Sequence, residues 1–129
     1  MTISKIEALV DAIATTTGAF HNPESEAYKL RSPLLVRSFA RPGKHEMNVG
    51  GRRVFTSMLA GYRAAVFDIE KKLSGESRAG IRPTDVLSNL LAVYEIHDSA
   101  KIVSFLRRAL QDQAINSNTP LTYFRESEN

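Results

Sequence analysis

The 129-residue sequence contains no cysteine, which excludes a disulfide scaffold, a thiolate metal site and a cysteine nucleophile. It also lacks any apolar run close to the roughly 20 residues that a membrane-spanning helix needs. The N-terminal stretch carries Glu7 and Asp11 among its apolar residues, which is not the pattern of a secretory signal peptide. We therefore expect a cytoplasmic protein that does not associate with membranes.

Catalytic and metal-binding motifs are missing as well. The three histidines, His21, His45 and His97, are separated by 24 and 52 residues, so no pair has the i, i+4 spacing of a helical zinc site. Gly43-Lys44 resembles the end of a phosphate-binding P-loop but lacks the glycine and the hydroxyl that this motif requires around it. No nucleophile has the context of an elbow or a triad. We expect a protein that is not an enzyme and holds no metal or cofactor, although distant residues can still converge on a site.

Composition and apolar spacing predict one all-α domain. With 43% hydrophobic and 24% charged residues, the chain has the make-up of a globular protein. Apolar residues recur at helical spacing, and no stretch alternates as a strand does. We expect residues 1–124 to form a compact single-domain bundle of four main helices and one or two short ones, with 125–129 as a frayed C-terminal tail.

The first part of the chain predicts two helices. Residues 3–17 carry one apolar face, and Ser4 followed by Glu7 has the spacing of a capping box at the helix start. A second helix is expected from Pro23 to about Ser32, with Asn22 as its N-cap.

The strongest helical pattern runs from Arg52 to Leu73 and predicts a long central helix. Its broad apolar face is expected in the core: Val54, Met58, Leu59, Tyr62, Ala65, Val66 and Ile69. Four leucines of other helices are expected to pack nearby: Leu9, Leu90, Leu106 and Leu110. A second, narrower stripe on the reverse face consists of Ala60, Ala64 and Phe67. A helix that is apolar on two sides is central in its domain or part of an oligomer interface, so this reverse stripe is a candidate interface.

Two more helices are expected at 85–94, with Thr84 as the N-cap, and from residue 98 or 99 to about 111. Their short connection resembles a helix-turn-helix, although any antiparallel helical hairpin gives the same pattern. The outer face of the second of these helices would offer three side chains to a nucleic-acid groove: Lys101, Ser104 and Arg108. Apolar residues of the C-terminal segment are expected to dock on the body: Leu121, Tyr123 and Phe124.

Positive charge is concentrated in residues 28–53, which we call the basic segment. It has seven basic residues and one acid, Glu46, so its net charge is +6 whereas the rest of the chain carries −3. The basic residues are Lys29, Arg31, Arg37, Arg41, Lys44, Arg52 and Arg53. Such concentration is typical of a surface that faces phosphates or an acidic protein partner. The alternative is a solvated basic loop.

The sequence GGRR at 50–53 directly precedes the predicted central helix. Glycines let the backbone approach a ligand, a helix start presents free N–H groups to anions, and arginines add bidentate donors. We therefore expect a non-catalytic protein that binds the phosphate backbone of DNA or RNA, as a small subunit of a larger nucleoprotein assembly. The alternative is a protein–protein adaptor or homo-oligomer that uses the reverse-face stripe of the central helix and the C-terminal aromatics.

Overall fold

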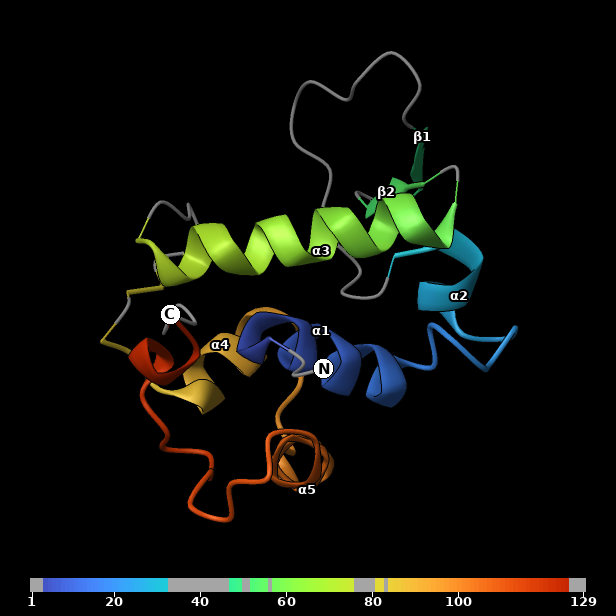
Figure 1. Cartoon of the computed structure of the whole chain (residues 1–129). Helices are drawn as coiled ribbons and strands as arrows, with labels where there is room; N and C mark the ends of the chain where they lie inside the picture. The colour runs from blue at the N-terminus through green and yellow to red at the C-terminus, as the bar shows by residue number, and fades with distance from the viewer. Residues whose placement is uncertain are drawn as a thin grey trace.

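The fold is all-α, as predicted, in a computed structural model that describes residues 4–32, 47–49, 52–55, 57–75, 81–82 and 84–125 (Figure 1). The helices are α1 (Lys5–Thr17), α2 (Glu26–Leu30), α3 (Met58–Leu73), α4 (Leu87–Val93), α5 (Ala100–Ala109) and the short 3-10 helix η1 (Leu121–Arg125). A small antiparallel hairpin of β1 (Met47–Val49) and β2 (Arg52–Val54) is the one regular non-helical element among the described residues. None of the described helices combines the length and the apolar character that crossing a membrane requires.

Helix α1 lies between α3 and α5, and it is buried on both sides (Figure 1). Leu9 and Ile13 are fully buried there, and they share the main core with Ile69 of α3, Leu90 of α4 and Leu106 of α5. Of the four leucines predicted to pack in the core, Leu9, Leu90 and Leu106 are confirmed as buried. Leu110 is partly buried against the same cluster. The fold therefore packs α3 and α5 on opposite sides of one apolar helix.

The bounds of α1 follow from its own sequence. Ser4 is the N-cap, and its Oγ accepts the backbone N–H of Glu7 at 3.0 Å, as predicted. Gly18 ends the helix in the left-handed conformation, with φ of 83°. A side chain at Gly18 would also meet the Cβ atoms of Asn22 and Ser25 at 3.0 and 3.2 Å, so the tight turn towards α2 needs glycine.

Helix α2 begins later than predicted and is shorter. Asn22 does not cap it, because its Oδ1 accepts the N–H of Glu24 two residues on and so forms a local turn. Ser25 is the N-cap instead, and its Oγ accepts the N–H of Tyr28 at 3.1 Å. The helix ends at Leu30, and Arg31 takes the left-handed conformation with φ of 54°.

Helix α3 is the longest described helix, but it begins at Met58 rather than Arg52. The preceding residues pair with Met47–Val49 as a hairpin, in the register Met47↔Val54 and Val49↔Arg52. Ser57 then caps the helix, and its Oγ accepts the N–H of Ala60 at 3.1 Å. A local cap and the pairing of residues 52–54 with residues 47–49 therefore set where this helix starts.

The prediction that Leu59 is a core residue is wrong, because its side chain is 58% exposed. The buried side of α3 is centred on Ala65 and Ile69, with Tyr62 and Val66 partly buried at its edge and Met58 packed on a smaller cluster. Leu59 lies about 120° around the helix from Ala65, at 100° per residue. The side chain of Val54 lies outside the described residues.

The C-terminal segment docks on the body, as predicted, and its hydrogen bonds to the start of α4 also decide where that helix begins. The backbone N–H groups of Leu87 and Ser88 donate to the carbonyls of Thr119 and Ser117 at 2.9 and 3.0 Å. These contacts place the helix start at Leu87, two residues after the predicted Asp85. Beyond them, the side chains of Leu121 and Phe124 are buried, while that of Tyr123 is half-buried.

Candidate nucleic-acid interface

The two ends of the basic segment meet at the N-terminal end of α3. The N–H of Phe55, just after β2, donates to the carbonyl of Leu30 in α2 at 3.0 Å. The Arg31 guanidinium donates to the Phe55 carbonyl at 3.2 Å, which closes the same junction from the other side. Figure 1 shows α2 and β2 side by side at this end of the molecule. Leu30, Arg31 and Phe55 therefore lie together at this junction.

The structure describes four of the seven predicted phosphate-binding residues. Lys29 is exposed on α2, and its ammonium can reach a ligand in solvent. Arg31 is exposed as well, but its guanidinium is bonded to the Phe55 carbonyl and holds the junction together. Arg52 and Arg53 belong to β2, where their backbones pair with Val49 and Asn48. The other three predicted residues, Arg37, Arg41 and Lys44, lie outside the described residues.

The predicted anion site at the start of the central helix is not formed. Arg52 and Arg53 lie in β2, and α3 begins five residues after Arg53. At that start the Ser57 hydroxyl already accepts the Ala60 N–H. The two arginines therefore belong to a strand and are not the first residues of the helix, as the predicted site required.

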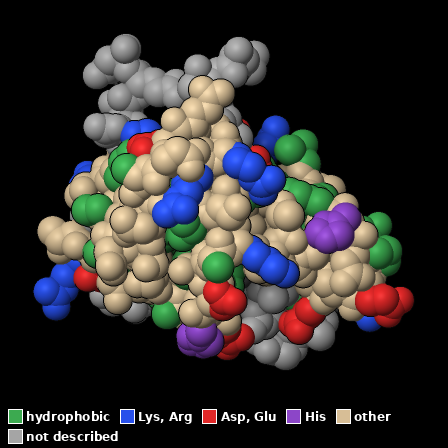
Figure 2. Space-filling view, turned by 90° about the horizontal axis from the view of Figure 1, so that it is seen from below, with side chains coloured by type: hydrophobic (Ala, Val, Ile, Leu, Met, Phe, Trp, Pro, Cys, Tyr) green, Lys and Arg blue, Asp and Glu red, His purple; other side chains and the backbone are tan. Residues whose placement is uncertain are grey.

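Helix α5 presents a second basic face. The three predicted groove-facing side chains, Lys101, Ser104 and Arg108, are all exposed on it. The opposite side of the helix is buried through Ile102 and Leu106. Figure 2 views the molecule from below, the side on which α5 lies in Figure 1, and lysine and arginine side chains gather near the middle of that face.

The connection between α4 and α5 is longer than a helix-turn-helix turn. It spans residues 94–99, whereas that motif joins its helices with about three or four residues. Arg107, next to the exposed face, is half-buried, and its Nε donates to the Ile115 carbonyl at 2.7 Å. That arginine holds the C-terminal segment in place, which leaves Lys101 and Arg108 as the basic side chains that α5 directs to solvent.

Two polar pairs tie α3 to its neighbours. The Tyr62 hydroxyl donates to Asp11 of α1 at 2.9 Å, and the Tyr94 hydroxyl donates to Asp68 at 2.5 Å. Asp68 also forms an ion pair with the buried ammonium of Lys72, at 2.7 Å. Burial raises the pKa of both tyrosines, and the facing carboxylates raise it further.

The Tyr62 and Asp11 pair is partly buried between α3 and α1. Burial also raises the pKa of Asp11, an effect that the hydrogen bond from Tyr62 partly offsets. Each pair places a tyrosine hydroxyl beside a carboxylate, in a contact that joins α3 to another part of the fold. In the described part of the chain, no three histidine and carboxylate side chains lie close enough together to hold a metal ion.

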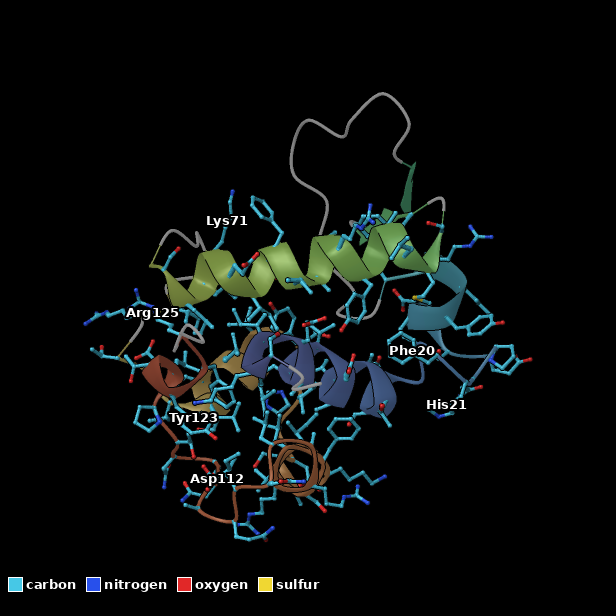
Figure 3. All side chains as sticks on the ribbon, viewed as in Figure 1. Phe20, His21, Lys71, Asp112, Tyr123 and Arg125 are labelled. Carbon is cyan, nitrogen blue, oxygen red and sulfur yellow. The ribbon has the colours of Figure 1, made fainter. Side chains whose placement is uncertain are left out.

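The candidate interface on α3 is partly exposed. Phe67 is 58% exposed, while Ala60 and Ala64 beside it are half-buried. The prediction that the C-terminal aromatics form part of an interface is wrong for Phe124, which is buried, and stays a prediction for Tyr123, which is half-buried. Phe124 is only 1% exposed because it fills the core, and Tyr123 packs edge-on against it while its hydroxyl donates to Asp112 at 2.9 Å (Figure 3).

Leu59, Arg63 and Glu70 share the outward side of α3 with Phe67, and sequence reasoning did not single them out for an interface. A helical projection with Gly61, Ala65 and Ile69 at the centre of the buried side would have placed these residues on the outward side. Comparisons of the chain with protein-family models, with curated proteins and with solved structures found no match.

Proposed function

We propose that this protein binds the phosphate backbone of nucleic acid through its basic segment, residues 28–53, without catalysing a reaction. The observation that carries the proposal is the concentration of charge: this segment is +6 while the rest of the chain is −3. A polyanion that approaches the molecule is attracted to the segment and repelled by the remainder, so charge alone orients it.

The junction between α2 and β2 supports this proposal. Because the Leu30–Phe55 and Arg31–Phe55 hydrogen bonds hold both ends of the segment together, Lys29 lies near the strand that carries Arg52 and Arg53. Basic residues that lie close together can contact neighbouring phosphates. Binding then depends on the charge of the nucleic-acid backbone more than on the base sequence. This mode of binding suits a subunit of a larger nucleoprotein assembly.

The test is a salt titration of binding to DNA and RNA, single-stranded and double-stranded, with alanine variants of the basic segment. Each of Lys29→Ala, Arg52→Ala and Arg53→Ala is expected to weaken binding similarly for all base sequences. Each should also reduce the slope of log affinity against log salt by about one, because one fewer phosphate is neutralised. Lys101→Ala and Arg108→Ala on α5 are the matched controls and should leave both quantities unchanged.

Two results would contradict the proposal. If the α5 controls lose affinity while the basic-segment variants do not, the exposed face of α5 is the nucleic-acid surface. If the folded protein binds neither DNA nor RNA at about 50 mM salt, where phosphate contacts are strong, the charge serves an acidic protein partner instead.

A further inference from the structure

The outward face of α3 carries two large exposed apolar side chains. Leu59 and Phe67 are each 58% exposed and lie eight residues apart, about 80° from each other around the helix axis. Lys71 extends from the side of α3 that faces away from α1 and α5, and its Nζ lies 4.9 Å from the centre of the Phe67 ring (Figure 3). Ala60 and Ala64 border Phe67 with small side chains, so another backbone can approach closely.

Charges of opposite sign flank Phe67 on this face. Arg63 lies one turn before it and Glu70 one turn after it, and both are exposed. Neither side chain forms an ion pair with any residue in the described part of the chain. The face therefore has Arg63 on one side of Phe67 along the helix and Glu70 on the other, with the Lys71 ammonium over the Phe67 ring.

We propose that α3 packs antiparallel against α3 of a second copy of this chain. A two-fold axis between the levels of Val66 and Phe67 places Arg63 of each copy level with Glu70 of the other, which forms two ion pairs. Arg63 and Glu70 are about 10 Å apart along each helix, so the two pairs lie on opposite sides of the axis. The two Phe67 rings then meet at the centre, as an isologous interface requires.

The charge pattern favours a second copy over other partners. An acidic partner would pair with Arg63 but would face Glu70 with like charge, and a basic partner would have the reverse problem. Parallel packing of two α3 helices would set Arg63 against Arg63. Antiparallel packing of the same helix presents the complementary sign at both positions.

The surface beside α3 has room for the arginine of the second copy. A shallow groove of about 550 Å³ lies between α3 and the start of α1, and its lining includes Leu59, Arg63, Val66 and Glu70. In the antiparallel arrangement, Arg63 of the second copy reaches the Glu70 end of this groove. Its alkyl stem can lie against Val66 while its guanidinium pairs with the carboxylate.

The first test is the mass of the full chain as a function of concentration, by sedimentation or light scattering. The wild type is expected to dimerise, and Phe67→Asp should raise the dissociation constant by about 30-fold or more, as loss of a central aromatic anchor does. Phe67→Asp should keep its helical circular dichroism, because the side chain is exposed in the single chain. Lys101→Glu on α5 is the control and should leave the dimer intact.

A charge exchange tests the antiparallel register itself. Arg63→Glu and Glu70→Arg should each weaken the dimer, because each places like charges at both ion pairs. A mixture of the two variants should form a heterodimer. One copy then has acidic side chains at positions 63 and 70 and the other has basic ones, so both contacts join opposite charges. A wild type that stays monomeric, or a mixture that forms no heterodimer while the single variants dimerise normally, would overturn the proposal. Neither readout involves nucleic acid, so the result is independent of the function proposed above.

Discussion

Leu9 and Leu59 are the same residue type on two helices that pack together, yet their environments are opposite. Leu9 of α1 is fully buried, while Leu59 of α3 is 58% exposed. Leu9→Ala should therefore lower the free energy of unfolding by about 2–5 kcal/mol through lost burial and the cavity that remains. Leu59→Ala should change it by less than about 0.5 kcal/mol, as a surface substitution does.

Urea denaturation of both leucine variants, followed by circular dichroism, measures this difference. It should be made at a protein concentration where the chain is monomeric, so that any loss of dimer at Leu59 does not enter the result. A large cost at Leu59 would mean that its side chain is covered in the single chain, against the observed exposure.

Single residues were predictable where one helix face decides their environment. The exposure of Lys101, Ser104 and Arg108 was expected because the polar and apolar sides of α5 are cleanly separated in the sequence. Leu59 was not predictable in the same way, because α3 is apolar on two sides. Only its packing against α1 shows which residues form the centre of the buried side.

At the scale of elements, α1 was predicted from signals within its own sequence, whereas the starts of α3 and α4 depend on pairing with other segments. Ser4 and Gly18 bound α1 from within its own sequence. The start of α3 depends on the pairing of 52–54 with 47–49, and the start of α4 depends on the carbonyls of Ser117 and Thr119. Apolar periodicity carries no information about such partners, so these two helices were predicted to begin too early.

The docked C-terminal segment is an element whose removal should be costly. Phe124 is 1% exposed in the main core, so Phe124→Ala should lower the free energy of unfolding by about 3–5 kcal/mol. Thr122→Ala, at an exposed position of the same 3-10 helix, is the matched control and should cost less than about 0.5 kcal/mol. Thermal unfolding of both variants compares them, and equal stability would show that η1 does not hold the C-terminal segment on the body.

At the scale of the whole molecule, sequence reasoning found the charge of the candidate site but not its shape. The +6 of residues 28–53 is a property of composition and was visible at once. The junction that brings Leu30 to Phe55 joins residues 25 positions apart, and no pattern in either segment indicates it. The predicted position of Arg52 and Arg53 at a helix start was wrong because both residues pair with Val49 and Asn48 in a hairpin.

The molecule should lose stability in alkali, because two tyrosines hold α3 to the rest of the fold. Tyr62 bonds α3 to α1 through Asp11, and Tyr94 bonds to Asp68 of α3. Burial raises the pKa of both above the ordinary tyrosine value of about 10. Above that pH the unfolded chain releases these two protons while the folded chain keeps them, so each further rise in pH favours unfolding.

Tyr94 should contribute up to about 1.4 kcal/mol of lost stability per pH unit above pH 10, and the less buried Tyr62 should contribute less because solvent screens its charge. Urea midpoints measured between about pH 8 and 11 test this, with Tyr62→Phe and Tyr94→Phe each giving a shallower decline than the wild type. Tyr28→Phe, at a tyrosine that is 41% exposed, is the matched control and should keep the wild-type slope. If Tyr94→Phe leaves the slope of stability against pH unchanged, the Tyr94 hydroxyl ionises as easily in the folded chain as in the unfolded one. Its hydrogen bond to Asp68 then does not raise the pKa of Tyr94.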